Sequence, residues 1–385
     1  MNRIVTSQLY DGSYVSAEAF LDEKYILLSP EVPVDQALID RLAEWNFDYL
    51  FTDGEVGDTP TTSAIATTED APLAAIDQGR RDAREMQEAQ KIYHKYLHFA
   101  EQLFGNFLQN GMLPINPIHD KIKSLLEEIK ERKRYILRVP ELDSGEANYI
   151  VDHAAKTALV AIATASSMKM PPHRLIDVGS AALLHEIGMV RLPSALYMSN
   201  RPLSDKEKKA ITTHPVLGFK VLRQLNYPMQ ICLAVLECRE NVDGSGYPRG
   251  IGADKISLYG RVLNAASTFA AMASPRPYRP AIDGHTIMKT LLTSVNTTYD
   301  NAVLQAMITT FSLFPYGTYV RLASGHRAMV VDIVPGKARF PVVRIITDKN
   351  GIPVREQPVT ETDSEQYAIT GVLDVDEITR IKSRR

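Results

Sequence analysis

The chain has 385 residues, of which 45% are hydrophobic and 23% charged. This composition is ordinary for a soluble globular protein and excludes a disordered or fibrous one, and the length predicts two or three domains. A formal net charge of -3 argues against duplex nucleic acid as a partner, since that binding needs a concentrated basic face. No apolar stretch reaches the roughly 20 residues of a membrane span, and the opening MNRIVTSQLYDG lacks a signal-peptide core, so we expect a cytoplasmic protein.

The N-terminal region predicts a small α/β domain over residues 1–54. Strand-like runs at 25–29 and 47–52 enclose a helix-like run at 37–45. The following sequence is rich in Thr, Ala, Pro and acidic residues and has no sustained periodicity. This composition predicts a solvated linker over 55–75.

Residues 76–140 predict a helical connector. A first helix over 77–109 carries one apolar stripe at three- and four-residue spacing, made of Ala89, Tyr93, Tyr96, Ala100, Leu103 and Phe107. The stripe fits a homodimer seam or packing on its own domain, and its length of only about three heptads favours the second interpretation. A second helix, about 118–137, is rich in charge and predicts a solvated face.

The rest of the chain predicts a mainly α fold, with an all-helical core over 141–313 and a β-rich C-terminal extension over 314–385. The extension contains the strand-like runs TYVRL, AMVVDIV and VVRIIT, separated by turns. Cys232 and Cys238 lie six residues apart in a helical segment, where they face different directions. They are poor candidates for a disulfide, which fits a reducing compartment.

Four candidate metal ligands are spread over separate predicted helices of the core, with two of them adjacent in one segment: His153, His185, Glu186 and His214. Imidazole and carboxylate groups bind iron, manganese and zinc, and an adjacent His-Glu pair can serve two ions when the carboxylate bridges them. Taken singly, a buried histidine is more often structural than ligating. The surrounding motifs are therefore needed for the assignment.

Those motifs are ALLHEIG at 182–188, THPVLG at 213–218, ECRENVDGSGYPRG at 237–250 and RVLNAASTFAAMASPRPYRPA at 261–281. In these segments the chain resembles the HD-GYP family, and the resemblance covers about 146–370. It implies an HD-type helical core that hydrolyses cyclic di-GMP at a centre of two or three metal ions. The same resemblance places His153, His185 and His214 at three of the family's histidine ligands. Glu186 stands where the family has a bridging aspartate.

Other ligand positions depart from the family pattern. Two consecutive histidines are replaced by Cys238 and Arg239, and two aspartates by Ser267 and Ala270. Cys238 can bind a metal as a thiolate, although a small buried apolar role is the commoner one. Arg239 cannot be a ligand, because its guanidinium does not lose its proton. Met189 replaces a lysine that the resemblance would place near the substrate phosphate.

The resemblance also implies nucleotide contacts. Arg276 and Arg279 match positions close to the phosphates of the cyclic dinucleotide, and Tyr247 and Asp243 belong to the signature loop. The planar fork of arginine suits phosphate oxygens. The alternative is structural: the DGSGYP turn positions helices, and RPYRP packs against it.

The altered ligands predict that two-metal hydrolysis is absent or very slow. Two divalent ions bring about four positive charges together, and losing carboxylates while gaining an arginine worsens that charge balance.

We therefore expect a catalytically impaired sensor or regulatory interaction protein in cyclic di-GMP signalling, with residues 1–54 as a surface for a protein partner. One alternative is a metal-dependent phosphodiesterase with an atypical site. Another is a scaffold that binds neither metal nor nucleotide. The retained ligands are an incomplete set for one divalent ion (iron, manganese or zinc), and the sequence leaves open whether any ion binds.

Overall fold

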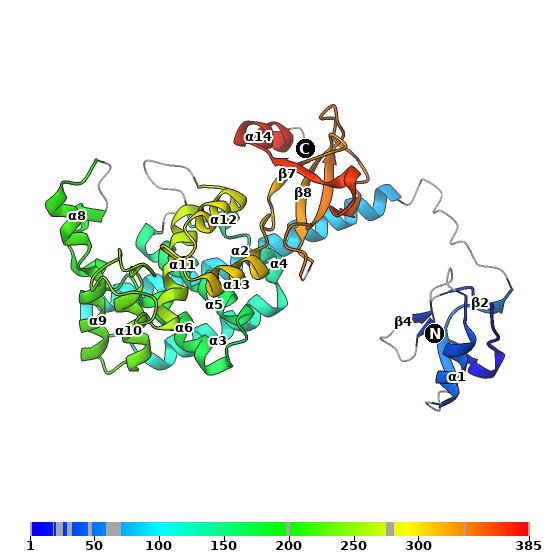
Figure 1. The fold of residues 1–385 in the computed structure, drawn as a ribbon, viewed down its shortest axis with the longest axis horizontal. Coiled ribbons are helices and arrows are strands. Elements are labelled where there is room, and N and C mark those ends of the chain that lie inside the picture. Colours follow the sequence, from blue (N-terminus) through cyan, green and yellow to red (C-terminus); the bar gives the residue numbers. More distant parts are fainter. Residues whose placement is uncertain are drawn as a thin grey trace. The chain divides into compact units, whose positions relative to one another are not determined.

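In the computed structural model the chain divides into two compact units, Met1–Gln78 and Gly79–Arg385 (Figure 1). The structure describes residues 2–17, 19–20, 26–28, 33–44, 48–58, 71–145, 147–197, 201–274, 281–334 and 336–383. Within those ranges, no helix has both the length and the apolar character that a membrane crossing requires. Cys232 and Cys238 are both free thiols.

The first unit is a small α/β structure, as the sequence predicts. Its strands are β1 (Asn2–Val5), β2 (Tyr14–Val15), β3 (Ala19–Phe20), β4 (Ile26–Leu28), β5 (Tyr49–Thr52) and β6 (Val56–Gly57). One sheet has the order β1-β5-β3-β4, and β2 pairs with β6. Helix α1 (Gln36–Glu44) buries Leu42 in a core that also contains Val15 and Leu50. Strand β6 falls within the stretch predicted as a linker.

The second unit is mainly helical. Its helices are α2 (Ala71–Asn110, beginning in the first unit), α3 (Ile115–Glu131), α4 (Lys133–Ile136), α5 (Tyr149–Ser167), α6 (Pro172–Leu184), α7 (Ser194–Tyr197), α8 (Asp205–Ile211), α9 (His214–Gln224), α10 (Met229–Glu237), α11 (Leu258–Ala273), α12 (Gly284–Thr293) and α13 (Asn301–Phe311). The apolar stripe predicted on the first long helix is buried in the core of this unit, as its own-domain interpretation requires.

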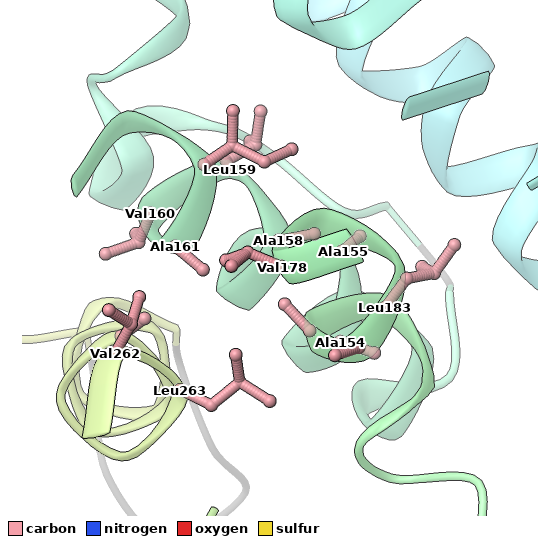
Figure 2. Packing of buried hydrophobic residues seen from close by; sticks show 14 of the residues in the cluster. Ala154, Ala155, Ala158, Leu159, Val160, Ala161, Val178, Leu183, Val262 and Leu263 are labelled. Carbon is pink, nitrogen blue, oxygen red and sulfur yellow. The ribbon is translucent and has the colours of Figure 1, made fainter. Parts of the chain in front are cut away.

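Helix α5 is the centre of the helical core. Every residue from Ile150 to Ala165 is buried, which is typical of a helix surrounded by other helices. Its many alanines favour the helix and allow close approach of neighbours. The side chain of Asn148 caps the first turn by accepting a hydrogen bond from the amide of Ile150 at 2.9 Å. Figure 2 shows alanines of α5 lying between side chains of α6 and α11, including Val178 and Val262.

The C-terminal region is rich in β-strands, as the sequence predicts, and these strands form an antiparallel sheet. Its strands are β7 (Tyr319–Leu322), β8 (Arg327–Asp332), β9 (Val342–Thr347), β10 (Val359–Glu361) and β11 (Ile369–Val372), in the order β10-β9-β8-β7-β11, followed by α14 (Val375–Ser383). Two ion pairs join this sheet to the helices. Arg344 of β9 pairs with Asp82 of α2, and Arg134 of α4 pairs with Asp332 of β8.

Candidate metal centre

A cavity of about 600 Å³ borders the candidate ligands of the helical core. Helices α5, α7, α8 and α9 contribute to its lining, together with the segments that follow α6, α7 and α10. The lining residues are Tyr149, Ile150, His153, Glu186, Met189, Leu196, Tyr197, Arg201, Pro202, Leu203, Ile211, His214, Arg239 and Tyr247. Candidate ligands from three separate segments of the sequence, His153, Glu186 and His214, therefore face one space.

Three of the predicted ligands converge to a single point. The Nε2 atoms of His153 and His185 lie 3.3 Å apart, and Oε1 of Glu186 lies 3.2 Å from the His185 nitrogen and 3.6 Å from the His153 nitrogen. Ligand atoms bonded to one ion at about 2.1 Å are separated by about 3.0–3.4 Å in octahedral or tetrahedral geometry. All three side chains are buried. The arrangement fits one divalent ion held by two imidazoles and a carboxylate.

The end of α6 orients this cluster. His185 is the residue after Leu184, and its Nδ1 lies 2.7 Å from the carbonyl oxygen of Ala182. A hydrogen bond donated from Nδ1–H fixes the tautomer and leaves the lone pair of Nε2 facing the cluster. A side chain at Gly188 would overlap the carbonyl oxygen of His214. Glycine at this position thus lets α9 approach closely enough to bring His214 into the cavity.

His214 lines the cavity but is not one of the three converging ligands. Its Nδ1 lies 2.7 Å from the carbonyl oxygen of Ile211, and its buried Nε2 has no hydrogen-bond partner among the described residues. Burial lowers the pKa of His214, so the ring is neutral near neutral pH. A neutral imidazole with a free lone pair can accept a proton or bind a metal.

Arg239 points into the site. Its Nη2 atom lies 2.8 Å from Oε1 of Glu186, the same oxygen that approaches the two histidines. Burial alone would raise the pKa of Glu186, but the electrostatic influence of the neighbouring His214, His185 and Arg239 side chains outweighs burial and holds that pKa well below its usual range. Glu186 is therefore a carboxylate with one oxygen engaged, while its Oε2 has no hydrogen-bond partner in the described part of the chain.

Two of the other substituted positions, Ser267 and Met189, border the cluster or the cavity. The hydroxyl of Ser267 is 3.3 Å from Nε2 of His153, while Ala270 is buried. Met189 lines the cavity in place of the expected lysine. Cys238 is fully buried, and that burial raises the pKa of its thiol to about 12, so the sulfur stays protonated. Its thiol is not among the converging ligand atoms.

The predicted nucleotide contacts are only partly described. Tyr247 lines the cavity with its ring edge-on to His214, at 6.3 Å between centroids. Asp243 is exposed in a turn, where its carboxylate accepts a hydrogen bond from the amide of Ser245 at 2.9 Å, and it does not line the cavity. Arg276 and Arg279 lie outside the described residues.

Sequence reasoning missed three cavity residues, Tyr149, Tyr197 and Arg201. The two tyrosine rings lie 6.3 Å apart, and Arg201 pairs with Glu207 at 2.6 Å. Glu207 belongs to a capping box with Ser204 at the start of α8. The Ser-x-x-Glu spacing is visible in the sequence and predicts that helix start. The two tyrosines carry no such signal.

Comparison with known proteins gives consistent results. Residues 141–303 match the family model described as HD domain. The cyclic di-GMP phosphodiesterase PdeB of Borreliella burgdorferi is 27% identical over 301 residues, which cover 77% of this chain and 79% of that protein. The cyclic di-GMP phosphodiesterase PA4108 of Pseudomonas aeruginosa is 23% identical over 369 residues, covering 93% of this chain and 88% of that protein.

The chain is also similar, over a shorter stretch, to 3'3'-cGAMP-specific phosphodiesterase 3 of Vibrio cholerae. The two sequences are 27% identical over 171 residues, which cover 44% of this chain and 37% of the Vibrio protein. Among solved structures, Bd1817, an HDG"Y"P protein from Bdellovibrio bacteriovorus, aligns with a TM-score of 0.44 at 13% identity. The alignment covers 80% of this chain and 97% of that structure.

Proposed function

Residues 141–303 are an HD domain whose relatives are cyclic di-GMP phosphodiesterases of the HD-GYP type, and from this premise we propose that the protein is a metal-dependent phosphodiesterase of cyclic dinucleotides. The observation that carries the proposal is the convergence of His153, His185 and Glu186 beside a cavity. Together with the relatives, this cluster supports hydrolysis with an atypical metal site better than the impaired sensor expected from the sequence.

His153, His185 and Glu186 would hold one ion of iron, manganese or zinc, the metals that prefer nitrogen and carboxylate ligands. Such an ion, when bound, polarises a phosphoryl oxygen and makes water a stronger nucleophile. Within the chain, the Nδ1 hydrogen bond of His185 keeps its Nε2 aimed at the cluster. Nε2 of His214 is buried, neutral and free to take a proton at the cavity wall.

The cavity suits a ligand with bases and phosphates. A volume of about 600 Å³ is in the usual range for small-molecule sites. Tyr149, Tyr197 and Tyr247 line it and offer aromatic faces on which bases can stack. Arg201 and Arg239 supply positive charge. Cyclic dinucleotides carry both features, and they are the ligands that the names of the relatives specify.

Hydrolysis of cyclic di-GMP by the purified chain, with Mn²⁺ or Fe²⁺ added after chelation, tests the proposal. We expect turnover that requires the metal. It should fall by about a hundredfold or more in His185→Ala, because this substitution removes one of the three converging ligands and leaves only His153 and Glu186. His173→Ala is the matched control, because His173 is exposed and lines another pocket. Absence of turnover with each metal would contradict the proposal.

The ion pair between Arg239 and Glu186 favours a second function, a cyclic dinucleotide receptor without hydrolysis. A guanidinium occupies the space beside the carboxylate and places a fixed positive charge where an additional ion would be repelled. This function predicts binding of cyclic di-GMP without turnover, and weaker binding after Arg276→Ala plus Arg279→Ala. Binding that the double substitution leaves unchanged would contradict the predicted phosphate contacts. A chain that binds neither metal nor nucleotide would be a scaffold.

A further inference from the structure

Oε1 of Glu186 contacts both Arg239 and His185, and it cannot keep these contacts and also bind an ion. The oxygen lies 2.8 Å from Nη2 of Arg239 and 3.2 Å from Nε2 of His185. An ion coordinated by the cluster would need the lone pairs of this oxygen and would place two positive charges beside the guanidinium. Because like charges at such separations repel strongly in a buried site, the ion and Arg239 in its present position disfavour each other.

The side chain of Arg239 has room to move while its backbone is fixed. Its carbonyl oxygen accepts a hydrogen bond from the amide of Tyr247 at 3.0 Å, and a side chain at Gly246 would overlap the backbone nitrogen of Asn241. The DGSGYP turn thus holds this stretch of backbone in place. The guanidinium itself borders the cavity, with the side chain 22% exposed, and its Nε atom has no hydrogen-bond partner among the described residues.

The cavity offers Arg239 no second protein carboxylate. Among the described residues that line it, Glu186 is the sole acidic side chain, while Arg201 adds another positive charge. Arg201 is already paired with Glu207. A guanidinium displaced from Glu186 would therefore need an anion from the ligand, and its planar fork matches two oxygens of a phosphate group.

We propose that Arg239 competes with a metal ion for Glu186 and binds a phosphate group of the ligand once the ion has taken that carboxylate. The inference rests on the proposed metal site and goes beyond it, since it assigns a role to a residue that cannot be a ligand. By linkage, phosphate must then tighten metal binding, and metal must tighten phosphate binding by the same factor. Arg239 is the residue that couples the two ligands.

The test is calorimetric titration of Mn²⁺ into the chelator-treated full chain, with and without saturating inorganic phosphate. Without phosphate, Arg239→Gln should bind Mn²⁺ about tenfold more tightly than the unaltered chain, because the competitor for Glu186 is gone. Phosphate should tighten Mn²⁺ binding about fivefold or more in the unaltered chain and less than about twofold in Arg239→Gln. Arg201→Gln, which removes an equal charge from the same cavity, should leave Mn²⁺ affinity within about twofold, because it leaves Glu186 paired.

Arg239→Lys is a second test variant for the case in which Arg239→Gln does not fold. It keeps a cation beside the buried carboxylate of Glu186. It should bind Mn²⁺ within about threefold of the unaltered chain but lose most of the phosphate effect, because lysine lacks the planar fork. If Arg239→Gln is unfolded, an undiminished phosphate effect in Arg239→Lys overturns the proposal.

The outcomes separate this inference from the proposed function. Equal or weaker Mn²⁺ binding by Arg239→Gln overturns the inference and leaves the one-metal site standing. An unchanged phosphate effect in Arg239→Gln also overturns it, since phosphate would then contact the ion alone. Mn²⁺ binding by Arg239→Gln but not by the unaltered chain supports the inference and contradicts a working one-metal enzyme. No Mn²⁺ binding by either protein overturns both.

Discussion

Ser267 lies beside the three converging candidate ligands, because its hydroxyl is 3.3 Å from Nε2 of His153. Ser267→Asp would add a carboxylate beside the three converging ligands. We expect Mn²⁺ to bind about tenfold more tightly, since a fourth, negatively charged ligand attracts the ion. The measurement is calorimetric titration, with Ser267→Asn as the control of similar shape and no charge. Equal affinities in the two variants would show that position 267 does not face the ion.

Substitution of Cys238 tests whether its sulfur is a metal ligand or only a thiol packed in the core. Its burial raises the thiol pKa to about 12, and its sulfur is not among the converging atoms. Cys238→Ala should therefore change Mn²⁺ affinity by less than about twofold, while the lost packing lowers the unfolding free energy by about 1 kcal/mol. Cys232→Ala, at the second buried thiol, is the control. A tenfold loss of affinity confined to Cys238→Ala would identify the sulfur as a ligand.

At the residue scale, sequence reasoning identified the cluster more completely than its surroundings. His185 and Glu186 belong to the ALLHEIG motif and the family resemblance identifies His153, and the structure brings the three together. The direction of Arg239 is not encoded in any local pattern, because it depends on a turn that closes eight residues later on Tyr247. The aromatic residues Tyr149 and Tyr197 were missed for a similar reason, since their proximity arises from helix packing.

At the scale of elements, a buried polar network ties α2 to α5. Asp152, beside His153 in sequence, accepts hydrogen bonds from the hydroxyl of Tyr93 on α2 and from Ser274 at the end of α11, the latter at 3.0 Å. Nζ of Lys156 lies 3.2 Å from the same carboxylate, and both charged side chains are buried. The network fixes the first turns of α5, from which His153 projects.

Two tyrosines on α2 provide a matched test of this network. Tyr93→Phe should lower the unfolding free energy by about 1.5–3 kcal/mol, because its hydroxyl donates to a buried charge. Tyr96→Phe should be neutral or slightly stabilising, since that hydroxyl is buried with no hydrogen-bond partner among the described residues. Urea unfolding of both variants checks the prediction. Equal losses would mean that packing, rather than the hydrogen bond to Asp152, makes the contribution.

The signature loop after α10 is held by two buried carboxylates. Glu240 accepts hydrogen bonds from the amides of Arg249 at 2.7 Å and Ile251 at 3.2 Å, and Glu237 accepts one from the amide of Ser257 at 2.9 Å. These contacts explain the role of the DGSGYPRG sequence in terms of the fold alone, without a bound ligand. They also fix the backbone from which Arg239 reaches Glu186, so the structural and functional interpretations of this loop are compatible.

At the scale of the whole molecule, the three candidate ligands His153, His185 and Glu186 all belong to the second unit. The hydrophobic core around α5 contains buried residues from Tyr93 to Phe311 and, as far as the structure describes the first unit, none from that unit. A fragment of residues 79–385 should therefore fold cooperatively and bind Mn²⁺ within about threefold of the full chain. Thermal unfolding and calorimetric titration check this. A fragment that unfolds, or loses the metal, would show that residues 1–78 support the core.

The overall architecture was predictable because it depends on periodicity and turn chemistry. The helical core, the small N-terminal α/β unit and the C-terminal antiparallel sheet are all present. The long first helix extends further than predicted, beginning at Ala71 in a stretch whose composition indicates a linker. The composition of this stretch indicates that it is solvated, but it does not determine where the helix begins, because helix length also depends on the elements that follow.

The number of metal ions per chain tests the central claim most directly. Elemental analysis of the protein after loading with Mn²⁺ and removal of excess should give one ion per unaltered chain and none for His185→Ala, because the cluster offers one set of converging ligands and Arg239 stands beside it. Two ions per chain would contradict a site for a single ion, and no ion in the unaltered chain would contradict a working one-metal enzyme.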